Sequence, residues 1–433
     1  MASKRSEIGI ALMGVGTIGS GVASALLRKA ETYARTAGCP LRLVRVLEQD
    51  PERPRRVGID PHIVTTDFSL IQDDPGIDIV IELLGGEHPA YDFIREALAR
   101  GKYVVTANKE VMAKHGPELR NLAWEHGVDI LYEASVGGGI PIIAPLKRDL
   151  LANDIVAIST IINGTTNYIL TSMSREGRDF AEALAQAQAL GYAEPDPTND
   201  VEGIDAAYKL TILASLAFHV NVRLEDVYYE GITRLTSRDF RYAQELGYTI
   251  KLLALAKKQD TSVQVRVHPV LLPEGEPLAK VDGVLNAVQV EGDLLGRALF
   301  EGSGAGPLPT SSAVIADVLD AAHSVITGGQ ERAAWRQEAA STIVPMGELH
   351  TRYYLRITVA DRPGVLAQIA RILGDGRISI ASVIQKEAYQ DAQTAELVIM
   401  THQAQEQAMR VALAQLAELP VVTEIGNFVR VEA

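Results

Sequence analysis

The sequence has few cysteines, few basic residues relative to acidic ones and no long apolar run, and each shortage excludes a class of protein. Its one cysteine, Cys39, cannot form an internal disulfide, and no Cys/His group has zinc-site spacing. Acidic residues outnumber basic ones by 55 to 41, for a net charge of −14, which argues against nucleic-acid or anionic-membrane partners. No stretch approaches the ~18 apolar residues of a membrane span. We expect a protein of the reducing cytoplasm.

The 433 residues are 47% hydrophobic and 22% charged, the balance of an ordinary globular protein. This length predicts two or three domains. Lys4 and Arg5 precede an apolar run, as in a signal peptide, but glycines interrupt the run at once, so we expect a first strand instead.

Strand and helix signals alternate over residues 1–141. Helical segments such as Ala90–Arg100 separate the apolar runs, a pattern typical of an α/β, doubly wound parallel sheet of the Rossmann type. The predicted strands are Ile8–Met13, Leu41–Leu47, Ile77–Leu84 and Tyr103–Thr106.

Residues 142–327 are predicted to form a mixed α/β substrate-binding and dimerisation domain. Its helix Ile204–Val220 is apolar on nearly every face, and its helix Ser311–Thr327 is expected to pack back on the first domain. Further strands are predicted at Ile155–Ile162, Val263–Val270 and Ala287–Val290.

A linker, residues 328–349, precedes a compact C-terminal domain at residues 350–433. The order there is strand, helix, strand, strand, helix, strand, which predicts a ferredoxin-like βαββαβ fold.

A G-x-G-x-x-G motif follows the first predicted strand and precedes a helix. Its glycines would let the backbone approach a pyrophosphate at a helix N-terminus, although the motif alone also fits a plain tight turn. It consists of Gly14, Val15, Gly16, Thr17, Ile18 and Gly19.

The second predicted strand ends at Glu48-Gln49-Asp50, where a bound cofactor's ribose is expected. An acidic residue there accepts hydrogen bonds from ribose hydroxyls and favours NAD, although the spacing is longer than the usual ~20 residues. The alternative is that Arg53, Arg55 and Arg56 hold the 2′-phosphate of NADP. We favour NAD.

Two motifs occur where ligands gather in such a sheet. Thr106–Glu110 stands at the end of a strand and contains Lys109, which is otherwise a solvated lysine at a helix start. Glu133–Ile140 combines a carboxylate with a glycine-rich bend that either turns carbonyls toward a hard cation or serves as a hinge.

The segment from Leu190 to Asp200 is rich in carboxylates and leads into a helix that carries Asp205 and Lys209. Their i,i+4 spacing places both on one face. A surface ion pair is the simple explanation, but the helix is apolar nearly all round. Charges there are costly unless they are paired or used, which favours a functional role.

Together these motifs resemble homoserine dehydrogenase over nearly the whole chain. The C-terminal unit, with Asp361–Leu366, looks like an ACT domain, a module that commonly binds amino acids. Matching segments are Gly14–Gly19, Thr106–Glu110, Glu133–Pro141, Asn163–Tyr168, Gly191–Lys209 and Gly302–Val314.

The resemblance implies NAD(P)-dependent interconversion of L-aspartate-4-semialdehyde and L-homoserine, in threonine, methionine and isoleucine biosynthesis. Lys209 would be the general acid and base, and Lys109 would orient substrate and cofactor. The implied substrate-binding residues are Gly191, Glu194, Asp200 and Asp205.

The resemblance also implies bound groups and partners. Besides the glycine motif, the cofactor would meet Thr106, Lys109 and Gly306. The protein is expected to form a homodimer or a larger homo-oligomer. Its ACT domain is expected to bind threonine or to serve association only.

In this family a basic residue often precedes the aspartate that ends the second strand. In this sequence Gln49 stands at that position, which supports NAD. The implied sodium ligands are Glu133 with the carbonyls of Val136, Gly138 and Ile140.

Two other readings remain open. Another two-domain Rossmann dehydrogenase of amino-acid metabolism would share the glycine motif without needing Glu194, Asp205 and Lys209 together. An ACT-based amino-acid sensor with a relict dehydrogenase fold would show no turnover.

Overall fold

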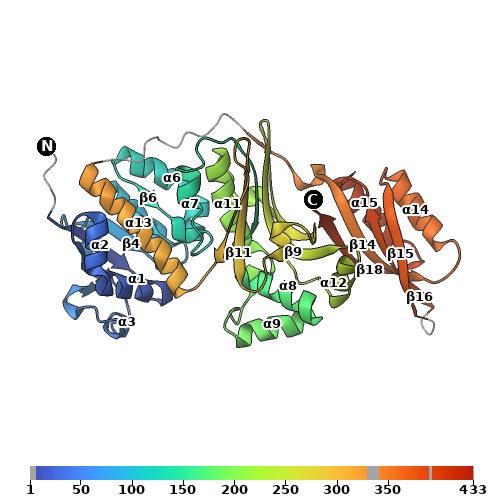
Figure 1. Ribbon diagram of the computed structural model, residues 1–433, viewed down its shortest axis with the longest axis horizontal. Coiled ribbons are helices and arrows are strands. Elements are labelled where there is room, and N and C mark those ends of the chain that lie inside the picture. Colours follow the sequence, from blue (N-terminus) through green and yellow to red (C-terminus); the bar gives the residue numbers. More distant parts are fainter. Residues whose placement is uncertain (1–5, 329–340, 390–392, 433) are drawn as a thin grey trace. The chain divides into compact units, whose positions relative to one another are not determined.

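The computed structural model describes residues 6–328, 341–389 and 393–432, which form two compact units interleaved in the sequence (Figure 1). Unit 1 comprises residues 1–158, 208–224 and 286–340, and unit 2 comprises residues 159–207, 225–285 and 341–433. Most of the predicted linker, 328–349, lies outside the described residues. Within the described part, no helix is long and apolar enough to cross a membrane.

Unit 1 is built on a six-stranded parallel sheet of the Rossmann type. Its strand order is β3-β2-β1-β4-β5-β6, as the alternating sequence pattern predicted. Every residue of β1, β4 and β5 is buried, because helices cover both faces of a parallel sheet. The strands are β1 (Ile8–Met13), β2 (Leu41–Leu47), β3 (Val64–Thr65), β4 (Ile79–Glu82), β5 (Tyr103–Thr106) and β6 (Ile130–Leu131).

The helices of unit 1 include one from much later in the chain. Helix α13 (Pro307–Thr327) packs against α1 and α2 (Figure 1), and its buried side chains include Val314 and Val318. The unit also holds the neighbouring strands β11 (Leu285–Gly292) and β12 (Gly296–Ser303). The other helices are α1 (Thr17–Arg28), α2 (Ala30–Ala37), α3 (Glu52–Arg56), α4 (Ser69–Gln72), α5 (Ala90–Ala99), α6 (Lys109–Glu125) and α7 (Ile143–Lys147).

Unit 2 contains a long antiparallel hairpin, β9 (Tyr248–Gln259) and β10 (Ser262–Pro273). The short strands β8 (Tyr228–Tyr229) and β13 (Thr342–Ile343) pair in parallel with β10. Strand β7 (Ile155–Ile161) and helix α11 (Ile204–Phe218) each begin in one unit and end in the other. The helices are α8 (Gly164–Glu176), α9 (Phe180–Ala189), α10 (Thr198–Val201) and α12 (Ser237–Glu245).

The C-terminal part of unit 2 has the predicted ferredoxin-like βαββαβ order. Its antiparallel sheet runs β18-β14-β16-β15, and α14 and α15 pack on each other over a buried apolar core. Strand β18 also pairs in parallel with β10, with Arg430 opposite Val270, so one sheet joins this module to the rest of unit 2. The elements are β14 (His350–Ala360), α14 (Val365–Asp375), β15 (Ile380–Tyr389), β16 (Thr394–Thr401), β17 (Ala404–Gln405), α15 (Glu406–Ala417) and β18 (Val422–Val431).

Candidate active site

Two glycines of the loop after β1 have a steric reason to be glycine. Gly14 has φ +89°, and a Cβ there would lie 2.7 Å from the Leu83 carbonyl oxygen. A Cβ at Gly19 would lie 2.0 Å from the Gly14 oxygen. Gly16 has no such neighbour within 4 Å and no side chain caps α1, so this backbone is open to a ligand. The loop therefore fits a pyrophosphate at the helix N-terminus.

A cavity of about 340 Å³ borders this loop and the end of β2. Gly14, Gly16, Glu48, Gln49 and Arg53 are among its lining residues. This composition fits the adenosine half of a dinucleotide, with the ribose beside β2. Of the residues on which the choice between NAD and NADP was predicted to depend, Glu48, Gln49 and Arg53 line this cavity, and Asp50, Arg55 and Arg56 do not.

Glu48 also organises the glycine loop. Its Oε2 accepts a hydrogen bond of 2.7 Å from the Val15 N–H, and its Oε1 accepts from the N–H groups of Gln49 and Asp50. The Arg53 Nη1 lies 3.7 Å from the Glu48 Oε1, and its side chain is half exposed. Asp50 is half exposed and is not among the residues that line the cavity.

A second cavity in unit 1, of about 370 Å³, brings the two predicted catalytic lysines together. Lys109 at the start of α6 and Lys209 on α11 both line it. Of the predicted site residues, Ile18, Gly138 and Gly306 also line this cavity. The arrangement places two amines beside the cofactor loop, where one can exchange a proton and the other can stabilise negative charge.

Polar groups surround the start of α6 at Lys109, and one of them, Glu82, was not singled out from the sequence. Thr106 and Glu82 are opposite each other on β5 and β4, and the Thr106 hydroxyl donates a 2.6 Å hydrogen bond to the Glu82 Oε2. The Asn108 side chain caps α6 by accepting from the Val111 N–H, and donates to the Gly86 carbonyl. Glu82 is fully buried, and this burial raises its pKa.

The predicted cation-binding bend uses its carboxylate for another purpose. The Glu133 carboxylate accepts hydrogen bonds of 2.6, 2.8 and 2.7 Å from the N–H groups of Ile142, Ile143 and Ala144, at the start of α7. Gly138 packs its backbone on Gly304, and a Cβ there would lie 2.3 Å from the Gly304 oxygen. Among the described residues, no group of three His, Cys, Asp or Glu side chains forms a metal cluster.

In unit 2, Asn163 joins two of the predicted substrate-binding carboxylates. Its Nδ2 donates to the Asp200 Oδ1 at 2.7 Å and to the Asp205 Oδ2 at 2.8 Å. Its Oδ1 caps α8 by accepting from the Thr166 N–H. Asp205 is only 3% exposed, so its carboxylate depends on such a donor. An asparagine before a helix is a local signal for the cap. The sequence contained no signal for the hydrogen bonds between Asn163 and the two carboxylates.

Gly191 and Glu194 occupy the exposed start of the loop that leads to Asp200. Gly191 has φ +74°, which favours glycine. The next residue, Tyr192, anchors the loop to α8: its ring contacts that of Tyr168, and its carbonyl accepts from the Thr165 hydroxyl. The Glu194 side chain is exposed, as a residue that meets a ligand from solvent can be.

Comparisons with known proteins now bear on this site. Residues 141–319 match the family profile of homoserine dehydrogenase, residues 14–133 that of the homoserine dehydrogenase NAD binding domain, and residues 353–421 the ACT domain. A homoserine dehydrogenase from Neisseria gonorrhoeae is 43% identical over 431 residues, covering 98% of this chain and 99% of that protein. The chain belongs to the homoserine dehydrogenase family. As a homoserine dehydrogenase it is an oxidoreductase.

Solved structures agree with this assignment. A homoserine dehydrogenase from Thiobacillus denitrificans superposes with a TM-score of 0.92 at 43% identity, covering 98% of each chain. A hyperthermophilic archaeal homoserine dehydrogenase in complex with NADPH has a TM-score of 0.62 at 28% identity, and the match covers 73% of this chain and 97% of that one. With the NAD-binding profile, these likenesses support a nicotinamide cofactor for this homoserine dehydrogenase. The individual residue roles and the predicted domain boundaries remain predictions.

Proposed function

We propose that this homoserine dehydrogenase interconverts L-homoserine and L-aspartate-4-semialdehyde, with Lys209 as the group that accepts and donates the proton. The observation that carries the proposal is the cavity lined by Lys109, Lys209 and Ile18 of the glycine loop. A proton-transferring amine thus borders the cavity that the cofactor loop also borders.

When bound, the nicotinamide accepts or supplies the hydride. Oxidation of the homoserine hydroxyl also releases a proton, which the neutral Lys209 amine takes from the hydroxyl oxygen. In the reverse direction the Lys209 ammonium returns that proton to the aldehyde oxygen. Lys109 orients the substrate and stabilises negative charge on the same oxygen.

The substrate's amino acid end is assigned to unit 2. Asp205 and Lys209 are one turn apart on α11. Asp200, Asp205 and Glu194 would bind the ammonium group of homoserine, with the Gly191 turn shaping the loop. Asn163 holds Asp200 and Asp205 in place through its two hydrogen bonds.

The cofactor and ion assignments belong to the same proposal. NAD is favoured, because the Glu48 carboxylate reaches the cavity where a 2′-phosphate would lie. Cofactor binding is also proposed for Val15, Thr17 and Thr106, none of which lines either cavity. Val15 is buried, and the Thr106 hydroxyl donates to Glu82. A sodium ion would be held by main-chain carbonyls of Glu133, Val136, Gly138 and Ile140.

The biological setting is proposed from the family and the domain composition. The enzyme would act in the cytoplasm, in threonine, methionine and isoleucine biosynthesis, as a homodimer or a larger homo-oligomer. Threonine is the proposed effector at the ACT domain, near the turn Asp361–Gly364.

The test is turnover by the full chain, followed by the absorbance of reduced nicotinamide with L-homoserine and either cofactor. Gly19→Val should abolish turnover, because any Cβ at this position collides with the Gly14 oxygen. Gly275→Ala is the control, since a Cβ there meets nothing within 4 Å. Absence of turnover in both directions, with sodium present, would overturn the proposal.

A further inference from the structure

A third cavity, of about 710 Å³, lies within unit 2 and shares no lining residue with the sites assigned above. Residues 228–238 form one side, and the C-terminal module forms the other. Its wall carries five arginines from several elements but only two glutamates, Glu230 and Glu424. The arginines are Arg234, Arg238, Arg356, Arg410 and Arg430.

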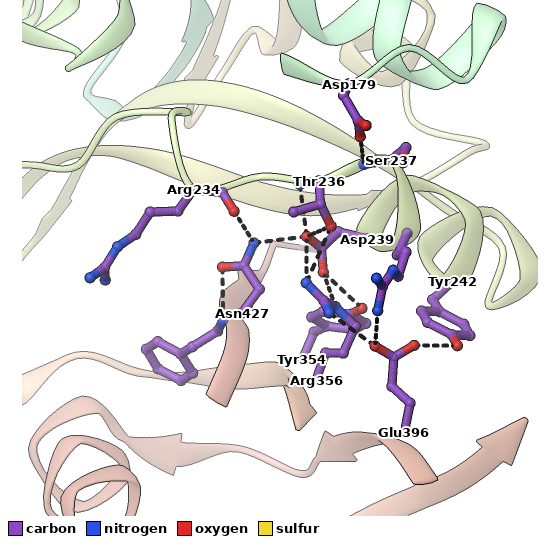
Figure 2. A network of polar contacts seen from close by, with 12 residues as sticks. Asp179, Arg234, Thr236, Ser237, Asp239, Tyr242, Tyr354, Arg356, Glu396 and Asn427 are labelled. Atoms are coloured by element: carbon purple, nitrogen blue, oxygen red, sulfur yellow. Dashed lines mark hydrogen bonds and ion pairs between the residues drawn. The ribbon is translucent and has the colours of Figure 1, made fainter. Parts of the chain in front are cut away.

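Two of these arginines, Arg356 and Arg430, are held by buried carboxylates. Arg356, 3% exposed, donates from Nε to the Asp239 Oδ1 at 2.7 Å and from Nη1 to the Glu396 Oε2 at 3.0 Å (Figure 2). Arg430, 2% exposed, donates to the Glu406 Oε1 at 2.6 Å. These three carboxylates are fully buried and are not among the lining residues. Of the two lining glutamates, Glu230 pairs with Arg430 at 2.5 Å, and guanidinium groups outnumber carboxylates on the cavity wall by five to two.

Two further arginines share the same carboxylate oxygens. Arg238 Nη1 lies 3.4 Å from the Glu396 Oε2 that Arg356 already uses. Arg410 Nε donates at 2.9 Å to the Glu406 oxygen that Arg430 also uses. Arg410 also lies over the Tyr228 ring, 5.2 Å from its centroid. Because each guanidinium has five N–H donors, Arg238 and Arg410 still keep donors for a ligand.

Arg234 supplies a guanidinium that is not committed elsewhere. Its main-chain carbonyl accepts a hydrogen bond from Asn427, but the described residues include no acceptor for its side chain, which carries no dashed contact in Figure 2. Leu413, Ile425 and Phe428 add an apolar part to the cavity wall. The cavity thus combines free guanidinium donors with a surface for an organic group.

We propose that this cavity binds a phosphorylated small metabolite, with its phosphomonoester group on Arg234, Arg238 and Arg410. These three arginines, on the loop after β8, on α12 and on α15, line one cavity and supply as many guanidinium groups as such a dianion has terminal oxygens. The organic part would lie on Leu413, Ile425 and Phe428. The site is separate from the Asp361–Gly364 turn, to which the threonine proposal refers.

The chain between the lining residues Glu230 and Arg234 contacts the segment that carries Asp200. The Ile232 N–H donates to the Val201 carbonyl at 2.8 Å, and a Cβ at Gly231 would lie 2.3 Å from the same oxygen. The Thr233 hydroxyl donates to the Glu202 carboxylate at 3.2 Å. A ligand that shifts residues 230–236 would therefore shift Val201 and Glu202, which follow Asp200. We expect its binding to change the KM for homoserine, a step that rests on the proposed function.

Binding is tested by calorimetry on the full chain, at constant ionic strength and without homoserine or nucleotide, with phenyl phosphate as the probe. We expect one site that the Arg234→Gln/Arg238→Gln double variant weakens by at least about tenfold. Arg371→Gln, on an exposed side chain outside the cavity, should bind as the wild type does. Gly19→Val, which blocks the glycine loop, should also retain this site.

Three outcomes would overturn the site. They are unchanged affinity in the double variant, loss of binding in Gly19→Val alone, and tighter binding of succinate than of phenyl phosphate, which would assign the cavity to carboxylates.

Coupling is tested by the KM for homoserine at saturating phenyl phosphate. The KM should change by at least about threefold in the wild type and Arg371→Gln, and not in the double variant. An unchanged KM in a protein that binds the probe would overturn the coupling. Absence of turnover would instead count against the proposed function and leave the calorimetric result standing.

Discussion

The side-chain amide of Asn163 donates a 2.8 Å hydrogen bond to the carboxylate of Asp205, which lies 42 residues further along the chain. The same amide holds Asp200, so one neutral side chain keeps two carboxylates in place. Without this donor, two negative groups would face each other across a partly buried site, and the geometry proposed for binding an ammonium group would be lost.

Asn163→Ser should raise the KM for homoserine by about tenfold and lower kcat less, because a serine retains the cap of α8 but loses the two-armed amide. Asn163→Ala should raise the KM similarly and also lower the free energy of unfolding by about 1 kcal/mol through loss of the cap. Steady-state kinetics and urea unfolding measure both. Asn121→Ala, on the exposed face of α6, is the control. A KM that stays at the wild-type value in Asn163→Ser would contradict the assignment of Asp200 and Asp205.

Glu82→Gln should retain kcat/KM within about threefold, because burial raises the pKa of Glu82 and an amide still accepts from the Thr106 hydroxyl. Glu82→Ala should lower kcat/KM by about tenfold or more, because it leaves the Thr106 hydroxyl without that acceptor beside Lys109. The measurement is kcat/KM of Glu82→Gln and Glu82→Ala under the same conditions. Equal losses would show that a negative charge, rather than a hydrogen-bond acceptor, is needed at this position.

Asp317 should make the enzyme's stability fall as pH rises. Burial raises the pKa of this carboxyl well above its usual range, although the Glu133 N–H donates to it. The native state therefore binds the proton more tightly than the unfolded chain does. The resulting stabilisation is complete below the unfolded pKa, about 3.9, and is lost as pH rises through the native pKa.

Asp317→Asn removes this titration, so the variant should gain stability relative to the wild type as pH increases. Urea unfolding from pH 5 to pH 8 would show the difference. Asp320→Asn, on an exposed residue of α13, should not change the slope. Parallel stability curves for the wild type and Asp317→Asn would refute this account of Asp317.

Arg53→Ala should separate the two cofactors. Arg53 lines the proposed adenosine cavity with its side chain half exposed, so its loss should lower kcat/KM for NADP by about tenfold and leave NAD within about twofold. Arg55→Ala is the control, because its guanidinium is paired with Glu52 on the surface. An equal loss of kcat/KM with NAD and with NADP would mean that Arg53 stabilises the cavity but does not bind the 2′-phosphate of NADP.

Much of unit 1 was predictable because parallel strands buried on both faces appear as short apolar runs. The predicted bounds of β1, β2 and β5 coincide with those observed.

Strand β9 of unit 2 was not predicted from the sequence. Lys251 interrupts its apolar run and is buried, held by the Val281 carbonyl and Asp282 about 30 residues away. A sequence pattern does not reveal such a distant partner.

The residue types of the site were predictable, but the hydrogen bonds between its residues were less so. Lys109 and Lys209 were predicted to act together, and they line one cavity. The role of Glu133 in a cation site stays a prediction, and the cap that its carboxylate forms on α7 was not predicted. The roles of Glu82 and Asn163 depend on contacts between residues far apart in the chain, which local patterns do not specify.

The most direct test of the central claim is kcat of Lys209→Ala with L-homoserine, measured beside its dissociation constant for the cofactor. The account predicts that kcat falls by about 10²–10⁴-fold while cofactor affinity stays within about threefold, because the lost amine moves a proton. Lys280→Ala, at an exposed lysine, should match the wild type. A Lys209→Ala variant that retains kcat within about tenfold would contradict the assignment of Lys209 as the proton-transferring residue.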